Sequence, residues 1–209
     1  MLKYYMKNGD SEKKIPILDP FEIENGGVEI VLPSKILSLQ AGYRKAVVKG
    51  VSHFQLDRAK FIKEKVAVNL TITFPSIRIK SEYYKLEGDI YGAVPISGEG
   101  KFELEVISFN FKGMVFLKQS EDEKSVLINY ISNPEFSFQQ IQVFIIFQSN
   151  TDVDGNIDGI FNAMMEDLMT QYLNRFNKYI ANSLNQYFID NLNLLFNKFE
   201  SWRLLATVL

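Results

Sequence analysis

Few residues in this sequence combine the type and the spacing that chemistry requires. His53, in the segment GVSHF, is the single histidine. One histidine cannot build the usual metal sites, and no G-x-S-x-G segment offers a nucleophile that it could activate as a base. The sequence has no cysteine, which excludes disulfides, zinc–thiolate sites and thiol catalysis within this chain. We therefore expect His53 to have a structural role.

The segment DGNIDG imitates a calcium-binding loop. The first, third, fifth and sixth positions of such a loop are occupied by Asp154, Asn156, Asp158 and Gly159. The twelfth position requires a bidentate glutamate and holds Met165 instead. The preceding segment IQVFIIFQ has the character of a strand, so the helix that should enter the loop is missing as well. We expect a helix-capping turn here.

Three further segments resemble functional motifs only in part. SGEG, Ser97 to Gly100, lacks the lysine and the serine or threonine of a phosphate-binding loop and is expected to be a turn. The acidic segment SEDEK, Ser120 to Lys124, is expected to be the solvated tip of a hairpin. Asn69-Leu70-Thr71 is a glycosylation sequon, which could be modified only if the asparagine faces outward. No constellation for catalysis remains, and no cofactor or metal is expected.

The composition is that of one folded domain with balanced charge. Apolar residues make up 46% and charged residues 23% of the 209 positions, which is ordinary for a soluble globular protein. The 23 lysines and arginines nearly balance the 25 aspartates and glutamates, so no net field favours nucleic acid or an anionic membrane. The longest apolar run in the sheet region, Val143 to Phe147, is too short to span a bilayer. We expect a single domain over residues 1–209.

Residues 28 to about 147 are predicted to be almost entirely β-strand. Apolar and polar side chains alternate with period two over residues 66–74, and the alternation resumes after Pro75. Its phase slips at Tyr83-Tyr84 and again at Val106-Ile107, where we predict a β-bulge. Glycines recur along these strands and mark bends, so we expect a strongly curved antiparallel sheet.

The C-terminal third is predicted to be one long helix from Ile157 onward, capped by Asp158 or Asp154. About 40 residues of helix would span about 60 Å. A heptad coiled coil is the alternative, but the apolar steps are mostly of four residues and no regular charge pairs flank them. The stripe recurs every three or four positions at Phe161, Met164, Leu168, Tyr172, Phe176, Ile180, Leu184, Phe188, Leu192, Leu195 and Phe199. We therefore predict an α+β fold in which the curved sheet wraps the long helix.

The segment KIPILDPFEI, Lys14 to Ile23, has two prolines that bracket Ile17, Leu18 and Asp19. Each proline fixes its own φ and excludes the residue before it from the helical region. The segment is too apolar for a linker, so we expect rigid, extended chain that leads into a sheet.

Four motifs in order resemble the insect takeout and juvenile hormone binding protein family. They are an I-P-x-L-D-P segment, a G-[LI]-x-x-F strand end, a proline-led strand ending in Y-x-[LI]-x-G, and a G-x-[GA] turn. The matching positions are Pro16, Leu18, Asp19, Pro20, Gly50, Phe54, Pro75, Tyr84, Leu86, Gly88, Pro95, Gly98 and Gly100. The tail, with Asn162, Asn174 and Asn191, also fits. The resemblance covers residues 2 to 199.

This resemblance implies a tubular lipid-binding fold, in which a short N-terminal helix ends at the proline segment and a curved sheet encloses the long helix. It also implies an insect protein secreted into haemolymph or sensory fluid and linked to feeding and circadian rhythm. Members usually carry a signal peptide and an N-terminal cysteine pair ahead of the proline segment. We expect both to be encoded upstream of this sequence. The end, SWRLLATVL, departs from the usual proline-containing tail.

For function, we expect a monomeric, non-catalytic carrier that transports a hydrophobic ligand in an internal tunnel. A juvenile hormone-like terpenoid, a fatty acid or a quinone would suit such a site. The helix face that carries Phe161, Met164, Leu168, Tyr172 and Phe176 should line it, with the Tyr172 hydroxyl as a polar handle.

The alternative is a protein-interaction module that acts through a receptor or partner. A stripe covered in the monomer favours the carrier, and an exposed stripe favours the interaction module. A lipid-modifying enzyme is least expected, because no nucleophile–base pair is present.

Overall fold

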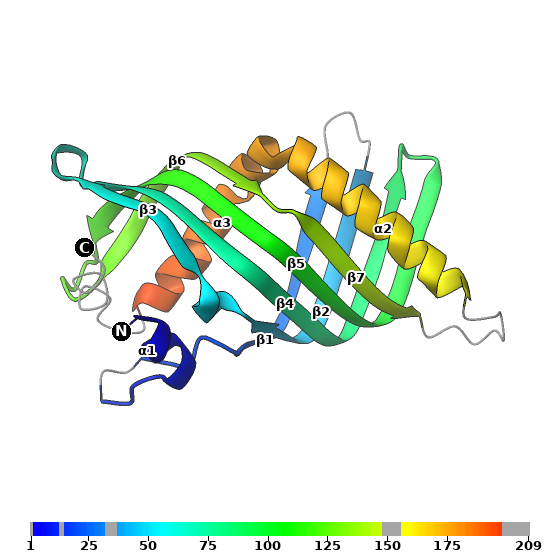
Figure 1. Cartoon of the computed structure of the whole chain (residues 1–209), viewed down its shortest axis with the longest axis horizontal. Coiled ribbons are helices and arrows are strands. Elements are labelled where there is room, and N and C mark those ends of the chain that lie inside the picture. The colour runs from blue at the N-terminus through cyan, green and yellow to red at the C-terminus, as the bar shows by residue number, and fades with distance from the viewer. Residues whose placement is uncertain (1, 13–14, 32–36, 148–155, 198–209) are drawn as a thin grey trace.

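The computed structural model describes residues 2–12, 15–31, 37–147 and 156–197. Seven strands form one sheet, and helices lie at both ends of the sequence (Figure 1). In chain order the elements are α1 (Leu2–Asn8), β1 (Phe21–Val31), β2 (Leu37–Lys49), the 3₁₀ turn η2 (Val51–His53), β3 (Gln55–Ile62), the 3₁₀ turn η3 (Lys63–Lys65), β4 (Ala67–Ile90), β5 (Val94–Gln119), β6 (Val126–Ser137), β7 (Gln140–Phe147), α2 (Asn156–Arg175) and α3 (Asn177–Asn197).

The sheet is built around two very long antiparallel strands, β4 with 24 residues and β5 with 26 residues. One edge of β4 pairs first with β3 and then with β2, which in turn pairs with β1. The outer edge of β5 pairs first with β7 and then with β6. Every pairing is antiparallel, and α2 and α3 follow the β7 and β6 side (Figure 1). The predicted α+β fold is confirmed.

The predicted slip at Tyr83-Tyr84 is confirmed as a shift in the β4–β5 register between Ser81 and Tyr84. The predicted bulge at Val106-Ile107 is wrong. There, the β4–β5 register runs without a shift on both sides of Pro75. Ser108, next to the slip on β5, has a φ of 54°. At this point the side chains of β4 and of β5 both switch the face to which they point. The apolar alternation therefore slips in each strand, while the pairing of residues between the strands stays the same.

The predicted single long helix is divided at Phe176 into α2 and α3. Helical hydrogen bonds nevertheless cross the division, because Phe176 N–H donates to Tyr172 C=O and Ile180 N–H donates to Phe176 C=O, each at 2.9 Å. The bend follows from packing, since α2 lies along β7 whereas α3 lies along β6. α2 already includes Asp158, so that residue is not its N-cap. Asp154 lies outside the described residues.

Side chains of both helices bind the backbone of the strands beside them. An edge strand has unpaired N–H and C=O groups, and these must find partners when they are buried. In α2, Glu166 Oε1 and Thr170 Oγ1 accept the N–H groups of Val143 and Ile141, at 2.9 and 3.1 Å. The spacing of four residues places both acceptors on one helix face.

Two asparagines each bind both backbone groups of a single residue, in β6 or in the link between β6 and β7. Asn174 accepts Phe138 N–H at 3.1 Å and donates to its C=O at 2.9 Å. In α3, Asn193 accepts Ile128 N–H at 2.8 Å and donates to its C=O at 2.7 Å. The amide side chain carries a donor and an acceptor like a peptide group. The helices therefore replace the neighbouring strand that β6 and β7 lack along this edge.

The proline segment connects α1 to the sheet as the sequence predicted. The N–H groups of Leu18 and Asp19 both donate to Met6 C=O in α1, at 2.8 and 2.9 Å. Ile15 is buried and pairs with Asp10 in an isolated bridge. The segment is not helical and delivers the chain directly into β1.

Replacing Asn193 with alanine is expected to destabilise the protein by about 1–3 kcal/mol, because it leaves two backbone groups of Ile128 without partners. The matched control is Asn191→Ala, because Asn191 is exposed and donates to Tyr187 C=O of its own helix. The control should stay within about 0.5 kcal/mol of wild type. Urea unfolding followed by circular dichroism measures both. Equal losses in the two variants would contradict a special role for Asn193.

Candidate ligand-binding site

One face of the sheet, here called the inner face, carries an apolar cluster that α2 covers. Its buried members are Tyr84, Phe138, Ile141 and Val143. The side chains packed against it keep part of their surface exposed, which distinguishes this face from a closed core; they are Leu86, Phe102, Leu104, Val106, Phe109, Phe136, Met169 and Leu173. The last two come from α2. The helix and the sheet thus present apolar, incompletely buried surfaces to each other.

A second cluster lies further along the same sheet, beneath α3. Val115, Ile128, Ile131 and Ile189 form its buried part. Ile189 is the contribution of α3, and Phe196 from the same helix packs at its border. Together the two clusters extend along both helices.

The opposite, outer face carries ion pairs. Arg78 binds Glu105 at 2.9 Å and Glu103 at 3.7 Å, and Lys80 binds Glu103 at 2.6 Å. These side chains are partly exposed, so the pairs add little to stability. A hollow of about 850 Å³ lies in this region, where Phe144 stands among charged side chains.

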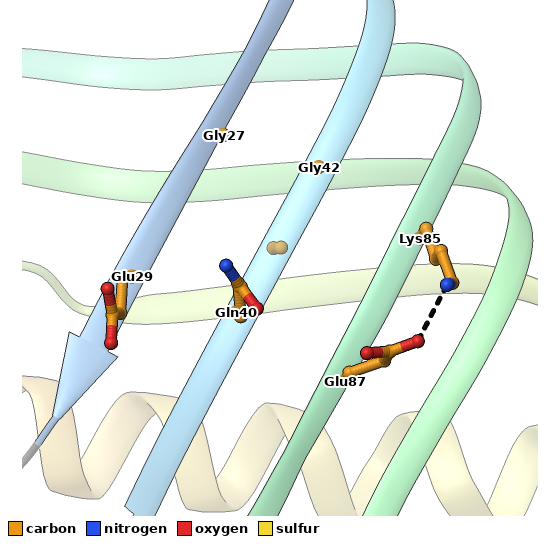
Figure 2. A pocket seen from close by; sticks show the side chains of 7 residues that line it. Gly27, Glu29, Gln40, Gly42, Lys85 and Glu87 are labelled. Atoms are coloured by element: carbon orange, nitrogen blue, oxygen red, sulfur yellow. Dashed lines mark ion pairs between the residues drawn. The ribbon is translucent and has the colours of Figure 1, made fainter.

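A smaller hollow of about 470 Å³ lies on the same outer face, over β1, β2 and β4. Gly27 and Gly42 form its floor, with Glu29 and Gln40 beside them (Figure 2). Lys85 and Glu87 border it and form an ion pair at 2.6 Å. Charged side chains border both hollows, and neither includes the predicted helix residues, so neither outer hollow matches the predicted site.

The predicted ligand-binding residues all belong to α2 or to the division that follows it. Tyr172 and Phe176 are partly buried, with ring centroids 6.1 Å apart. Phe161, Met164 and Leu168 lie in α2, but their side chains are outside the described part of the structure. Their joint contact with a ligand stays a prediction.

Tyr43 on β2 is an inner-face residue that the sequence analysis missed. It pairs with Tyr84 in the ladder, and paired residues share a face. Its hydroxyl lies over Gly26 of β1, where a methyl group at position 26 would overlap it. Burial raises the pKa of Tyr43, and Tyr187 of α3 is close enough to raise it further. Tyr43 was visible in sequence only as an alternating position, with nothing to tell the inner face from the outer one.

The sequence matches the description "Haemolymph juvenile hormone binding protein (JHBP)" over residues 1–206. The chain belongs to this family. Takeout 1 of Epiphyas postvittana has a similar structure, with a TM-score of 0.66, 14% identity, and coverage of 94% of this chain and 87% of that chain. A lipopolysaccharide binding protein matches at 14% identity and a TM-score of 0.35, over 92% of this chain and 39% of its own. No curated protein matches the sequence.

In this JHBP-family chain, Asp19, Ser52 and His53 come together, but not as a catalytic triad. Asp19 Oδ1 accepts Gly50 N–H at 2.9 Å, and Oδ2 accepts the N–H of Ser52 at 2.8 Å as well as its hydroxyl. The histidine does not lie between serine and carboxylate, because its Nε2 contacts Lys7 Nζ at 2.9 Å. Ser52 is 0% exposed and cannot reach a substrate. The group links the strand ends around η2 to the proline segment.

Metal binding and membrane crossing also lack support in the part of the chain that the structure describes. Within the described ranges, no group of three His, Cys, Asp or Glu residues could hold a metal ion. The calcium-like segment is only partly included in them, since Asp154 falls outside. None of the described helices is long and apolar enough to cross a membrane.

Asp19→Asn is expected to lower the stability of the protein at neutral pH and to make that stability depend less on pH in the acidic range. Burial raises the pKa of Asp19, but the bonds from Ser52 and Gly50 outweigh it, so its pKa lies below the usual value. A carboxylate with a lowered folded-state pKa stabilises the protein above its unfolded pKa of about 3.9. That stabilisation is lost as the pH falls toward the folded pKa.

Urea midpoints measured between pH 7 and pH 2 test this expectation. The wild type should lose more stability than Asp19→Asn as the pH falls below about 4. Parallel curves for the two proteins would show that this carboxylate does not contribute.

Proposed function

We propose that this protein is a non-catalytic carrier that holds a hydrophobic ligand between the α2–α3 helices and the inner face of the sheet. The observation that supports it is the incompletely buried apolar surface shared by α2 and the strands. Met169 and Leu173 of α2 pack against the same buried cluster as Leu86 and Phe102 of the strands. We further propose that Phe161, Met164, Leu168, Tyr172 and Phe176 line the ligand.

The energetics of such a site are sufficient for useful affinity. Burying about 500 Å² of apolar ligand surface would contribute roughly 12 kcal/mol before the costs of ordering. Those costs bring typical complexes to micromolar or nanomolar affinity. Methionine side chains such as Met169 adapt to ligands of varied shape.

Membership of a family described as juvenile hormone binding supports an apolar terpenoid as ligand. Long-chain fatty acids and quinones have the same apolar character. The same membership supports secretion into an extracellular fluid and a role in transport, and we propose both for this protein. Mass spectrometry of a solvent extract of the purified protein would identify the lipid that it carries.

Leu168→Trp is expected to weaken binding of a long apolar fluorescent probe at least tenfold, about 1.4 kcal/mol, because the indole would fill ligand space. The matched control is Gln171→Trp, which adds the same side chain at an exposed position of α2. Probe titration measures both variants, and circular dichroism checks that helicity is retained. Unchanged probe affinity in a folded Leu168→Trp protein would show that the ligand does not bind against this helix.

His53→Gln is expected to leave ligand affinity within about threefold of wild type, about 0.65 kcal/mol. The side chain is exposed, and its Nε2 contacts Lys7 Nζ of α1. Incubation with a hormone-like ester should yield no product from either protein. Ester hydrolysis by the wild type that disappears in the variant would overturn the non-catalytic proposal.

A protein-interaction module is the second candidate, and the outer side of α3 is the observation that favours it. Phe188 and Leu194 are 52% and 65% exposed. The predicted stripe is therefore covered at Ile180 but exposed at Phe188. A receptor or partner in feeding or circadian behaviour would use this surface. If a partner binds there, Leu194→Glu should abolish capture of that partner and leave probe binding intact. If the protein is only a carrier, the substitution should change neither measurement.

A further inference from the structure

The glycosylation sequon Asn69-Leu70-Thr71 lies on β4, between β3 and β5. It is the single N-x-S/T segment of the sequence. Successive residues of a strand point to opposite faces of the sheet. Leu70 packs against the apolar cluster beneath α3, so Asn69 and Thr71 point to the outer face. The requirement for an outward-facing asparagine is therefore met.

The Asn69 side chain is accessible and makes no bond that holds the fold. It keeps part of its surface exposed, and within the described residues its amide has no hydrogen-bond partner. Asn110 on the same face differs, because its amide donates to Thr73 Oγ1 at 2.8 Å. The residues that pair with Asn69 are Lys60, which is exposed, and Met114. A group attached to Asn69 Nδ2 would therefore extend outward without breaking a side-chain contact.

An aromatic pair lies beside the sequon on the same face. Phe116 of β5 stacks on Tyr130 of β6, with ring centroids 4.1 Å apart and 13° between the planes. Phe116 pairs with Ala67, two residues before Asn69, and such diagonal neighbours lie about 7–8 Å apart. Tyr130 is 46% exposed. Because the negative face of an aromatic ring attracts C–H groups, the pair is a platform on which a sugar attached at Asn69 can pack.

We propose that Asn69 carries an N-linked glycan whose first N-acetylglucosamine packs against Phe116 and Tyr130. In this modification Asn69 Nδ2 forms a bond to C1 of the sugar, and the bond between C1 and a lipid pyrophosphate donor breaks. The pyrophosphate leaves with the bonding electrons, and the amide releases one proton. The oligosaccharyltransferase of the secretory pathway supplies the donor and requires a hydroxyl such as that of Thr71. This inference rests on the proposed secretion of the protein and is independent of its ligand.

Mass spectrometry of peptides from the secreted protein measures whether Asn69 is occupied. The full chain is fused to a cleavable secretion signal and expressed in cultured insect cells. We expect a glycan at Asn69 in the wild type and in Thr71→Ser, which preserves the sequon, and its loss in Thr71→Val. Because the fused signal brings the chain into the secretory pathway, an unmodified Asn69 in the secreted wild type would overturn this inference and leave the proposed secretion standing. Recovery of the natural protein from the cytosol of its own tissue would contradict secretion and the modification together.

Phe116→Leu tests the contact between the glycan and the aromatic pair. Enzymatic removal of the glycan should lower the thermal midpoint of the wild type by about 2–4 °C, the size expected for one aromatic contact. The same treatment should lower the midpoint of Phe116→Leu by less than half as much. The matched control is Phe144→Leu, which removes an exposed phenylalanine from the outer face of β7 and should keep the wild-type shift. Equal shifts in Phe116→Leu and wild type would overturn the packing of the sugar on this pair.

Discussion

The fold depends on how the open edge of β6 and β7 is satisfied. Each strand has a neighbour on one side only, and a buried backbone group without a partner costs more than an ordinary hydrogen bond contributes. α2 and α3 resolve this with side chains rather than with another strand. Asn174 binds the N–H and the C=O of Phe138 between β6 and β7, and Asn193 binds those of Ile128 in β6. Because these bonds fix which helix residue faces which strand residue, they also fix where the apolar clusters meet.

The charge difference between the faces follows from the same arrangement. With the helices attached to the β6–β7 edge, one face of the sheet lies beneath them and the other faces water. Arg78, Lys80 and Glu103 alternate with inner residues along their strands and can pair with one another at the surface. Apolar side chains occupy the inner face beneath the helices, where a buried charge without a partner would be costly.

Sequence patterns predicted the strands and their order of appearance well, because period-two alternation depends only on one buried face. They also located the slip at Tyr83-Tyr84. They did not identify the polar residues that lie at the contact between the helices and the sheet. Asn174 and Asn193 lie on the helix face that contacts the sheet, and a search for apolar periodicity passes over them. The search followed residues such as Phe188 instead, which is 52% exposed.

Two further features of the structure could not be predicted from the sequence, and each has a physical reason. The division of the helix at Phe176 involves no proline or glycine, so it depends on the directions of β7 and β6, which no local signal encodes. Tyr43 alternates like its neighbours, and only the attached helices decide which face is inside. The candidate site was therefore predictable as a region of α2, whereas its strand side required the three-dimensional arrangement. Periodicity already predicted a curved sheet that wraps the helix, and the family resemblance added that this arrangement is a tubular fold.

The use of asparagine at the helix–sheet contact has a chemical consequence for the age of the molecule. Asparagine is among the thermolabile residues, and its amide hydrolyses slowly to a carboxylate. At Asn193 this change would remove the donor to Ile128 C=O and place a negative charge against that oxygen. Leucine side chains at the same contact would not undergo this hydrolysis. The contact that holds the helix to the sheet is thus also a place where deamidation would loosen it.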